Sequence, residues 1–334
     1  MSRGSGTLGG LVASACQVLS RPGYPSHQQM NGLHITGWGT ALPERRVTNA
    51  DIVERVDTTE EWIVERTGIL ERRVGGTTSG LAAEAGAQAM ERAGLEAADI
   101  DLVILATTTP DKTVPATAPS VQHALGLSCG AFDLNAACSG FVYGLVVAQG
   151  MLSTGNRRIL LIGAETLSRI TDWDDRSTCI LFADGAGAVV VESREGEGLL
   201  GWDLQADGAS LSVLYSDVGS TFQMQGREVY RRAVHAMVES SRRAMQQAGV
   251  GPDDIHLLVP HQANLRIIEA ATRRLGIPLE RTAVVLQTTG NASAASVPLA
   301  LGSMLDQGRI SPGDLVLFSG FGAGMTAASA VLRW

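Results

Sequence analysis

A chain of 334 residues is long enough for two ordinary domains or for one large layered unit. Its 45% hydrophobic and 18% charged residues are globular proportions, which argue against a disordered chain. The formal net charge of −8 argues against a general nucleic-acid binder, and no apolar run approaches the ~20 residues of a membrane span.

Residues 1–30 precede the first clear strand pattern. Their weakly apolar stretch is broken by two glycines and lacks a small-residue cleavage site, so we expect a disordered tail rather than a signal peptide. The cysteines are scattered and without C-x-x-C spacing, at Cys16, Cys129, Cys138 and Cys179. This usage predicts reduced thiols in a cytoplasmic protein, with neither a disulfide framework nor a metal site.

Three pairs of segments resemble each other in the same order along the chain. Each half contains a helix pattern closed by glycine and followed by an apolar strand, then a second apolar strand, then a glycine-rich turn. The matched segments are 89–105 with 244–259, 158–163 with 314–320, and 182–187 with 321–324. This order predicts a duplicated α/β unit with halves at 31–198 and 199–334, in which helices cover mostly parallel sheets.

Cys138 lies between a predicted strand at 131–134 and a predicted apolar helix at 138–151. At the N-terminus of that helix, the macrodipole and free backbone N–H groups favour a thiolate over a thiol of ordinary pKa, ~8.5. A free cysteine is more often a small buried core residue. The small residues on both sides of Cys138 nevertheless favour a sharp turn with an approachable sulfur.

His261 follows the apolar strand 257–259 and precedes a predicted helix that begins near Asn264. A histidine at such a junction is equally well a hydrogen-bonded structural group or a catalytic one. Asn291 lies in a Gly-Asn turn, where asparagine is common for purely conformational reasons. A composite site of these residues with Cys138, at the junction of the two halves, is geometrically reasonable, since sites commonly lie between such units.

A cysteine, a histidine and an asparagine also fit a papain-like hydrolase. The Cys-Gly-Ser-Cys-Trp signature of that family is absent, and its fold is not a duplicated α/β unit. The chain from about residue 32 to residue 334 instead resembles β-ketoacyl-acyl-carrier-protein synthase III, a member of the thiolase superfamily. The matching segments, in chain order, are 42–44, 49–51, 61–69, 137–141, 182–188, 259–264, 290–296 and 320–324.

The resemblance implies a thiolase-like duplicated α/β fold with five layers, α-β-α-β-α, and two mixed, mostly parallel sheets. It also implies a two-step acyl transfer. Cys138 would take an acyl group from acyl-coenzyme A, and malonyl-acyl carrier protein would then lose CO₂ and attack the thioester. His261 and Asn291 would stabilise the enolate, the backbone N–H groups of Cys138 and Ala323 would stabilise the other oxyanion, and Phe321 would favour decarboxylation.

The same resemblance assigns residues to substrate entry. Trp62 and Arg66, four residues apart on one predicted helix face, would contact the adenine and the phosphates of coenzyme A, with Arg176 beside them. Asn264 would bind the pantetheine arm, and Tyr230 replaces an aromatic residue expected there. The alternative for Trp62 and Arg66 is a buried tryptophan next to a solvated arginine.

A local basic patch stands out against the acidic background. Arg266, Arg273 and Arg274, with Arg231 and Arg232 on the preceding helix, are candidates for docking an acidic carrier protein. An ordinary solvated helix face is an equally good interpretation of Arg273 and Arg274. Arg266 is better supported, because it lies close to Asn264 at the expected entrance.

Val114 stands where acetyl-specific members of the family carry a phenylalanine that closes the acyl pocket across a dimer interface. The resemblance implies a homodimer, and the smaller valine predicts room for a branched or longer primer. No cofactor is expected, because acyl-coenzyme A is a substrate. Three functions remain open: an initiating condensing enzyme, an acyltransferase or polyketide-priming synthase on the same scaffold, and a non-catalytic partner of a synthase. Intact Cys138, His261 and Asn291 count against the third.

Overall fold

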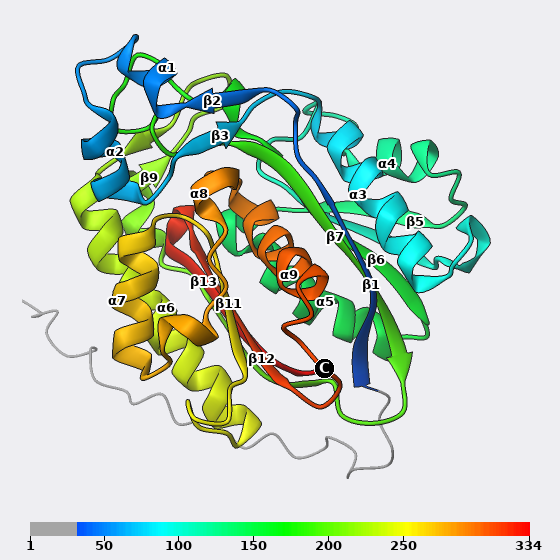
Figure 1. The fold of residues 1–334 in the computed structure, drawn as a ribbon. Coiled ribbons are helices and arrows are strands. Elements are labelled where there is room, and N and C mark those ends of the chain that lie inside the picture. Colours follow the sequence, from blue (N-terminus) through cyan, green and yellow to red (C-terminus); the bar gives the residue numbers. More distant parts are fainter. Residues whose placement is uncertain (1–31) are drawn as a thin grey trace, which may run out of the picture. The chain divides into compact units, whose positions relative to one another are not determined.

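The computed structural model describes residues 32–334, which form two β-sheets with helices on and between them (Figure 1). The expected tail at 1–30 lies outside the described residues. The first sheet has the order β1 (Gly32–Ala41), β7 (Asp184–Arg194), β6 (Arg158–Thr166), β4 (Leu102–Ala106) and β5 (Gly130–Leu134). The second has the order β11 (Leu257–Pro260), β12 (Leu315–Gly322), β13 (Thr326–Arg333) and β8 (Leu199–Gln205).

The helices complete five layers, as the resemblance implied. One outer layer, α3 (Thr78–Ala93) and α4 (Ala118–Ala124), covers the first sheet. The other, α6 (Gly226–Ala248) and α7 (Leu265–Leu275), lies on the side of the second sheet, which α6 contacts directly. Helices α5 (Gly140–Ser153) and α9 (Ser296–Asp306) lie between the two sheets (Figure 1). Because α5 and α9 are buried against a sheet on both sides, their sequences are largely apolar.

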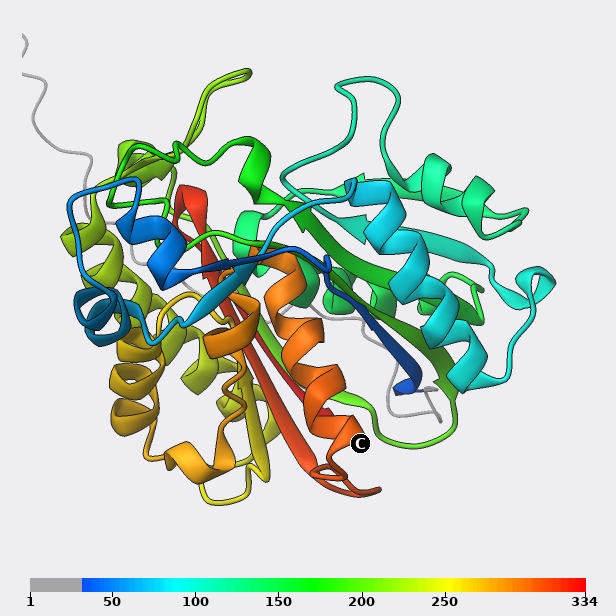
Figure 2. The ribbon, with the colours of Figure 1, turned by 45° about the horizontal axis from the view of Figure 1, so that its top comes forward.

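Shorter elements surround these layers. Two small ribbons pair β2 (Arg46–Thr48) with β3 (Glu71–Arg73) and β9 (Leu214–Tyr215) with β10 (Gln223–Met224). The remaining helices are α1 (Asn49–Val53), α2 (Glu60–Thr67) and α8 (Leu286–Thr289). Figure 2 shows the segment of β9 and β10, in lime, projecting away from the sheets.

The sheets are mixed, but the expectation that they are mostly parallel is wrong. In the first sheet, β4 pairs in parallel with β5 and β6, whereas β7 pairs antiparallel with β1 and β6. In the second, β11–β12 is parallel, and β12–β13 and β13–β8 are antiparallel. A parallel pair needs a crossover connection, and the links from β6 to β7 and from β12 to β13 carry no crossover helix.

The two sheets repeat the same plan. In each, a helix closed by a left-handed glycine, Gly94 after α3 and Gly249 after α6, leads into a fully buried strand, β4 or β11. The strands of the first sheet lie within 32–194 and those of the second within 199–333. The middle layer therefore receives one central helix from each half of the chain.

A short 3-10 turn precedes each central helix. The turn Ala137–Ser139 leads into α5, and the turn Ser293–Ala295 leads into α9. In both turns the first residue has a positive φ, 49° at Ala137 and 44° at Ser293, a conformation that side chains rarely adopt. Within residues 32–334, no helix is both long and apolar enough to cross a membrane.

Candidate active site

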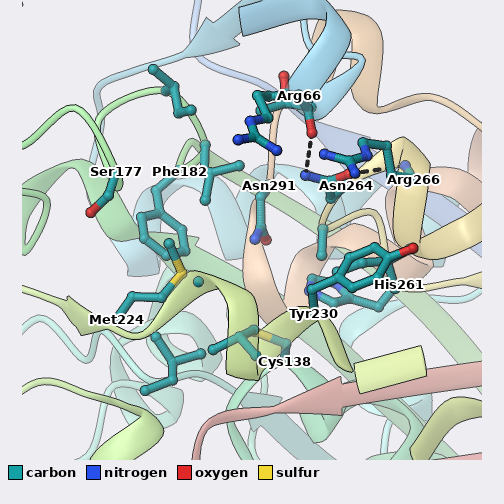
Figure 3. Close-up of a pocket in the computed structure, with 18 of the residues that line it drawn as sticks. Arg66, Cys138, Ser177, Phe182, Met224, Tyr230, His261, Asn264, Arg266 and Asn291 are labelled. Carbon is teal, nitrogen blue, oxygen red and sulfur yellow. Dashed lines mark hydrogen bonds between the residues drawn. The ribbon is translucent and has the colours of Figure 1, made fainter. Parts of the chain in front are cut away.

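A cavity of about 470 Å³ lies where the two halves of the chain meet. Its walls come from segments far apart in the sequence, including α2, the turn before α5, α6, the start of α7 and the end of β12. Nine residues predicted from the sequence line it: Trp62, Arg66, Cys138, Tyr230, His261, Asn264, Arg266, Asn291 and Phe321. Figure 3 shows the side chains of Cys138 and Asn291 directed into this space.

Cys138 is held by contacts from the second half of the chain. A Cβ added to Gly322 would lie 2.5 Å from the Cys138 backbone nitrogen, so only glycine permits this close approach. The Ser139 hydroxyl donates to the Thr326 carbonyl oxygen at 3.2 Å, and the Thr326 hydroxyl donates to the Ala136 carbonyl oxygen at 3.0 Å. The turn that carries the sulfur is thus fastened to the start of β13.

The expected direction of the Cys138 pKa is wrong. Cys138 lies in the 3-10 turn just before α5 and is partly exposed where it lines the cavity, and burial raises the pKa of its thiol to about 12. The charge of Glu165 acts in the same direction. The resting thiol therefore holds its proton at neutral pH.

His261 follows β11 and is 1% exposed. Its backbone N–H donates to the Ser319 carbonyl oxygen at 2.7 Å, which fixes the residue at the strand end. Burial lowers the pKa of the imidazole to about 3, so the ring is neutral and carries one N–H donor. Nδ1 has no hydrogen-bond partner among residues 32–334, and the ring centres of His261 and Phe321 lie 5.4 Å apart with the two planes at 67°.

Asn291 is fixed through both its backbone and its side chain. Its N–H donates to the Leu181 carbonyl oxygen at 3.0 Å, and its own carbonyl oxygen accepts from Ala183 N at 2.9 Å. Oδ1 accepts from Ser293 N at 3.0 Å. Because the acceptor end of the amide is engaged in this way, the Nδ2 donor end is turned toward the cavity (Figure 3).

The mouth of the cavity is aromatic and positively charged. Trp62 and Arg66 lie on α2, which Thr59 caps through its side chain, so the predicted helix and spacing are confirmed. The guanidinium groups of Arg66 and Arg176 lie 5.5 Å and 5.0 Å from the Trp62 ring centre. Arg176 stands outside the cavity lining and donates to the Asp57 carbonyl oxygen at 2.8 Å.

Asn264 and Arg266 form the facing wall. Asn264 is the N-cap of α7: its Oδ1 accepts from Arg266 N at 2.9 Å, and its Nδ2 donates to the Arg66 carbonyl oxygen at 2.8 Å (Figure 3). An amide can accept and donate once more at each end, so Asn264 keeps capacity for a ligand. The Arg266 guanidinium lies 5.6 Å from the ring centre of Tyr230.

Several predicted residues stand outside the cavity. Val114 is 82% exposed in the loop before α4, and Ala323 begins the 3-10 turn after β12. Arg231 and Arg232 both bind Glu228, with Arg231 Nη2 at 2.7 Å, so their charges are partly compensated. Arg273 and Arg274 occupy the last turn of α7.

The sequence analysis missed three polar residues beside the predicted ones. Arg227 lines the cavity mouth next to Tyr230, and nothing in the sequence around it signals this position. Glu165 is 0% exposed near the end of β6, where Thr108 N and Thr109 Oγ1 donate to its carboxyl group, and Ser293 begins the 3-10 turn before α9. A carboxylate that ends an otherwise apolar strand was the available signal for Glu165. Within residues 32–334, no group of three metal-binding side chains forms a metal site.

The layered fold and the cysteine, histidine and asparagine on one cavity define a cysteine-dependent acyl-transfer enzyme. Comparison with known proteins narrows this class. A family model described as 3-oxoacyl-[acyl-carrier-protein] synthase III matches residues 132–208, and the model of its C-terminal part matches residues 245–334. The β-ketoacyl-[acyl-carrier-protein] synthase III of Erythrobacter litoralis is 51% identical over 316 residues, which cover 90% of this chain and 98% of the relative.

Comparison with solved structures also places similar synthases beside this chain. The 3-oxoacyl-[acyl-carrier-protein] synthase III of Aquifex aeolicus is 44% identical with a TM-score of 0.89, covering 91% of this chain and all of that one. The priming β-ketosynthase from the R1128 polyketide pathway is 36% identical with a TM-score of 0.88, covering 93% of this chain and 99% of that one. The chain belongs to the β-ketoacyl-[acyl-carrier-protein] synthase III family. It is an initiating condensing enzyme, and the alternative of an acyltransferase or a polyketide-priming synthase on the same scaffold is not favoured.

Proposed function

We propose that this enzyme loads an acyl group from acyl-coenzyme A onto Cys138 and condenses it with malonyl-acyl carrier protein. The observation that carries the proposal is the meeting of Cys138, His261 and Asn291 on one cavity with a basic mouth. The products are a 3-oxoacyl-acyl carrier protein, coenzyme A and CO₂. The chain would need no cofactor, because a thiol and neutral hydrogen-bond donors supply the chemistry.

The first step is attack of the Cys138 sulfur on the thioester carbonyl. The tetrahedral oxyanion would be held by the backbone N–H groups of Cys138 and Ala323, a pairing supported by the close packing of Gly322 on the Cys138 nitrogen. Collapse of this intermediate expels coenzyme A and leaves an acyl thioester on Cys138.

The second step begins when malonyl-carrier protein enters the same cavity and loses CO₂. The enolate oxygen that forms would accept hydrogen bonds from the neutral His261 ring and from Asn291 Nδ2. Phe321, next to His261, would place an apolar ring beside the malonyl carboxylate and favour its departure as neutral CO₂. The carbanion then attacks the thioester carbon, and the Cys138 sulfur leaves.

The basic mouth suits a ligand with phosphates and an adenine ring. Arg66, Arg176 and Trp62 form one cluster of planar groups, and Arg266 faces them from α7. Guanidinium groups bind phosphates through paired hydrogen bonds and stack on flat rings. We assign this cluster to coenzyme A, Asn264 and Tyr230 to its pantetheine arm, and the surface beside Arg266 to the acidic carrier protein.

We also propose that two copies of the chain form the working enzyme, in the cytoplasm, where the thiols stay reduced. Val114 is 82% exposed on a loop, and Phe132 and Leu134 on the edge strand β5 are only partly buried. An edge strand with half-exposed apolar residues is a ready surface for a second copy. In that dimer Val114 would reach the partner's acyl pocket and leave room for a branched or longer primer.

The direct test is the intact mass of the protein after incubation with acyl-coenzyme A thioesters of different chain lengths, with Cys138→Ala as the control. An acyl adduct that is absent from the Cys138→Ala protein supports the covalent step, and the best-loading chain defines the primer. A protein that forms no adduct with any of these thioesters contradicts the proposed acyl donor.

Two variants test the finer assignments. In a dimer, Val114→Phe shifts loading toward acetyl groups, whereas a chain that elutes as a monomer and keeps its chain-length preference contradicts the shared pocket. Arg266→Ala raises the KM for malonyl-carrier protein severalfold, and Arg231→Ala changes it less than about twofold, since Glu228 already compensates Arg231. Equal effects would contradict docking beside Arg266.

A further inference from the structure

Arg72 is a completely buried arginine, with an exposed fraction of 0%. It stands in the middle of β3, which packs against α8, the helix that leads into Asn291 (Figure 1). Buried arginines are normally paired with a carboxylate, but no Asp or Glu in residues 32–334 forms an ion pair with Arg72. Because an unpaired buried charge is costly, the contacts of this side chain indicate what its retention gains.

The guanidinium group donates to neutral acceptors. Nε and Nη2 both donate to the Ile180 carbonyl oxygen, at 3.0 Å and 2.5 Å, and Nη1 donates to Asn49 Oδ1 at 2.6 Å. Asn49 is itself fixed, since its Nδ2 donates to the Ile69 carbonyl oxygen at 2.9 Å. The planar guanidinium presents donors in a fixed fork, which suits two acceptors on different segments. Arg72 therefore ties the segment of Ile180 to the start of α1.

The segment that follows Ile180 holds the backbone of Asn291. Asn291 N donates to the Leu181 carbonyl oxygen at 3.0 Å, and Ala183 N donates to the Asn291 carbonyl oxygen at 2.9 Å. These two hydrogen bonds form a short parallel bridge between the two segments. The anchor that Arg72 provides thus lies one residue before the first bond to Asn291.

Arg72 also packs directly beneath this turn. A Cβ added to Gly290, the residue before Asn291, would lie 3.2 Å from Arg72 Cγ and 2.7 Å from the Cβ of Ala183. Gly290 has a φ of 66°, in the region that favours glycine. Hydrogen bonding through Ile180 and packing through Gly290 are two separate routes from one side chain to the Asn291 backbone.

We propose that Arg72 is a positioning residue that aims the Asn291 amide at the enolate oxygen. Arg72 stands outside the cavity lining, so it acts through Ile180 and Gly290 rather than on substrate. The effect on condensation rests on the proposed function, whereas the support of the Asn291 backbone does not. Cys138 is held instead by Gly322 and Thr326, so loss of Arg72 should affect condensation more than loading.

The first test compares the two half-reactions in Arg72→Met, which keeps a long side chain and removes the donors. We expect the kcat of malonyl-carrier protein decarboxylation to fall at least about tenfold, with KM within about twofold and acyl loading within about threefold. Intact mass measures loading, and release of labelled CO₂ measures decarboxylation. Arg72→Lys keeps the charge but not the fork, so it should lose decarboxylation as well. Full activity of Arg72→Lys would overturn the proposal.

The second test is amide hydrogen exchange, which needs no substrate. In Arg72→Met the exchange of Asn291 N–H and Ala183 N–H, followed by peptide mass, should be at least about tenfold faster. Arg73→Met is the matched control, because its side chain lies on the other face of β3 and donates to the Pro43 carbonyl oxygen. It should leave both the exchange and the ratio of the two half-reactions unchanged.

Thermal unfolding checks that each variant folds. If Arg72→Met does not fold, Asn49→Ala decides, since it frees one end of the guanidinium and should give a smaller loss of the same selective kind. Unchanged exchange at Asn291, or equal losses of loading and decarboxylation, overturns the positioning role. An unmodified protein that neither loads nor decarboxylates would instead contradict the proposed function, and exchange would still decide the role of Arg72.

Discussion

The turn before α5 and the turn before α9 have the same backbone but different side chains. In the first, Asn135 Oδ1 accepts from Ala137 N at 3.1 Å, and in the second, Asn291 Oδ1 accepts from Ser293 N at 3.0 Å. Each turn then passes through a residue of positive φ into a 3-10 turn and a central helix. The second turn has Ala294 at the position that Cys138 holds in the first.

The asparagines differ most in their surroundings. Asn135 is exposed, whereas Asn291 is 5% exposed and lines the cavity. The same asparagine turn is thus a local cap in one half and a donor aimed at a ligand in the other. The two turns share a backbone conformation, and Asn291 is the asparagine that is buried on the cavity wall.

The ends of the strands beside the two turns also carry different side chains at equivalent positions. β4 ends at Ala106, which pairs with Gly163, and β11 ends at Pro260, which pairs with Ser319. The residues that follow these strands are Thr107 and His261. Two positions beyond the paired residues stand Glu165 and Phe321. The first half therefore presents a hydroxyl and a carboxylate where the second half presents an imidazole and a phenyl ring.

The largest expected effect comes from measuring acyl loading of Cys138 separately from condensation with malonyl-carrier protein. We expect His261→Ala or Asn291→Ala to lower the condensation rate roughly 10²–10³-fold, because each removes a donor to the enolate. Loading of Cys138 should change less than about tenfold, since that step does not use these donors. Intact mass measures loading, and release of labelled CO₂ from malonyl-carrier protein measures decarboxylation. Equal losses of loading and of decarboxylation would contradict the assignment of His261 and Asn291 to the condensation step.

Close packing against each turn allows a paired test. A Cβ at Gly322 would lie 2.5 Å from Cys138 N, and a Cβ at Gly163 would lie 2.4 Å from the Ala294 carbonyl oxygen. Gly322→Ala and Gly163→Ala should each destabilise the protein by about 1–3 kcal/mol through this overpacking. We expect Gly322→Ala to lose more loading activity, because it displaces the nucleophile. Gly150→Ala on α5 meets nothing within 4 Å and serves as the neutral control in urea unfolding.

The histidine of the second half predicts a pH dependence. Burial lowers the pKa of the His261 imidazole from an ordinary 6.5 to about 3 in the folded protein. Below pH 6.5 the unfolded chain therefore binds a proton at His261 that the folded chain does not bind. Stability should therefore fall as the pH drops, by about 2 kcal/mol between pH 6.5 and pH 5 from this group. Urea unfolding of the His261→Gln protein at pH 6.5 and at pH 5 should show a fall in unfolding free energy that is smaller by this amount. An unchanged pH dependence would mean that the ring is protonated in the folded state.

The smallest effect concerns the exposed asparagine. Asn135→Ala removes one side-chain bond to Ala137 N, which we expect to cost about 1 kcal/mol of unfolding free energy, as for other lost caps. Decarboxylation of malonyl-carrier protein should stay within about twofold of the original rate. Thermal unfolding and the CO₂ assay measure the two quantities. A large loss of decarboxylation would place Asn135 in the site and contradict the comparison.

Local signals in the sequence predicted the helices at the cavity. Thr59 caps α2, and Asn264 caps α7, and both helices end at left-handed glycines, Gly68 and Gly276. These signals act within a few residues, so they survive in any tertiary context. Whether neighbouring strands run parallel or antiparallel has no such local signal, because it depends on which distant segment packs alongside. That is why the duplicated strands were found while their mostly parallel pairing was wrong.

Burial limited the prediction of the site in the same way. The motif around Cys138 placed this residue on the cavity wall, but the direction of its pKa depends on burial, which the fold supplies. Glu165 shows in the sequence only as a carboxylate near the end of an apolar strand, and its complete burial and its hydrogen bonds from Thr108 and Thr109 need the fold. Chemistry that lies within one segment can be predicted from sequence, whereas chemistry between segments needs the fold.

The fastening of the Cys138 turn to β12 and β13 also has a consequence for the newly made chain. A ribosome completes the strand and helix that flank Cys138 long before it reaches Gly322 and Thr326. Until those residues arrive, the sulfur stands in water with the ordinary pKa of a cysteine, ~8.5, and is open to oxidants and electrophiles. Synthesis of the last strands thus fixes the sulfur on the wall of the cavity and limits its contact with solvent.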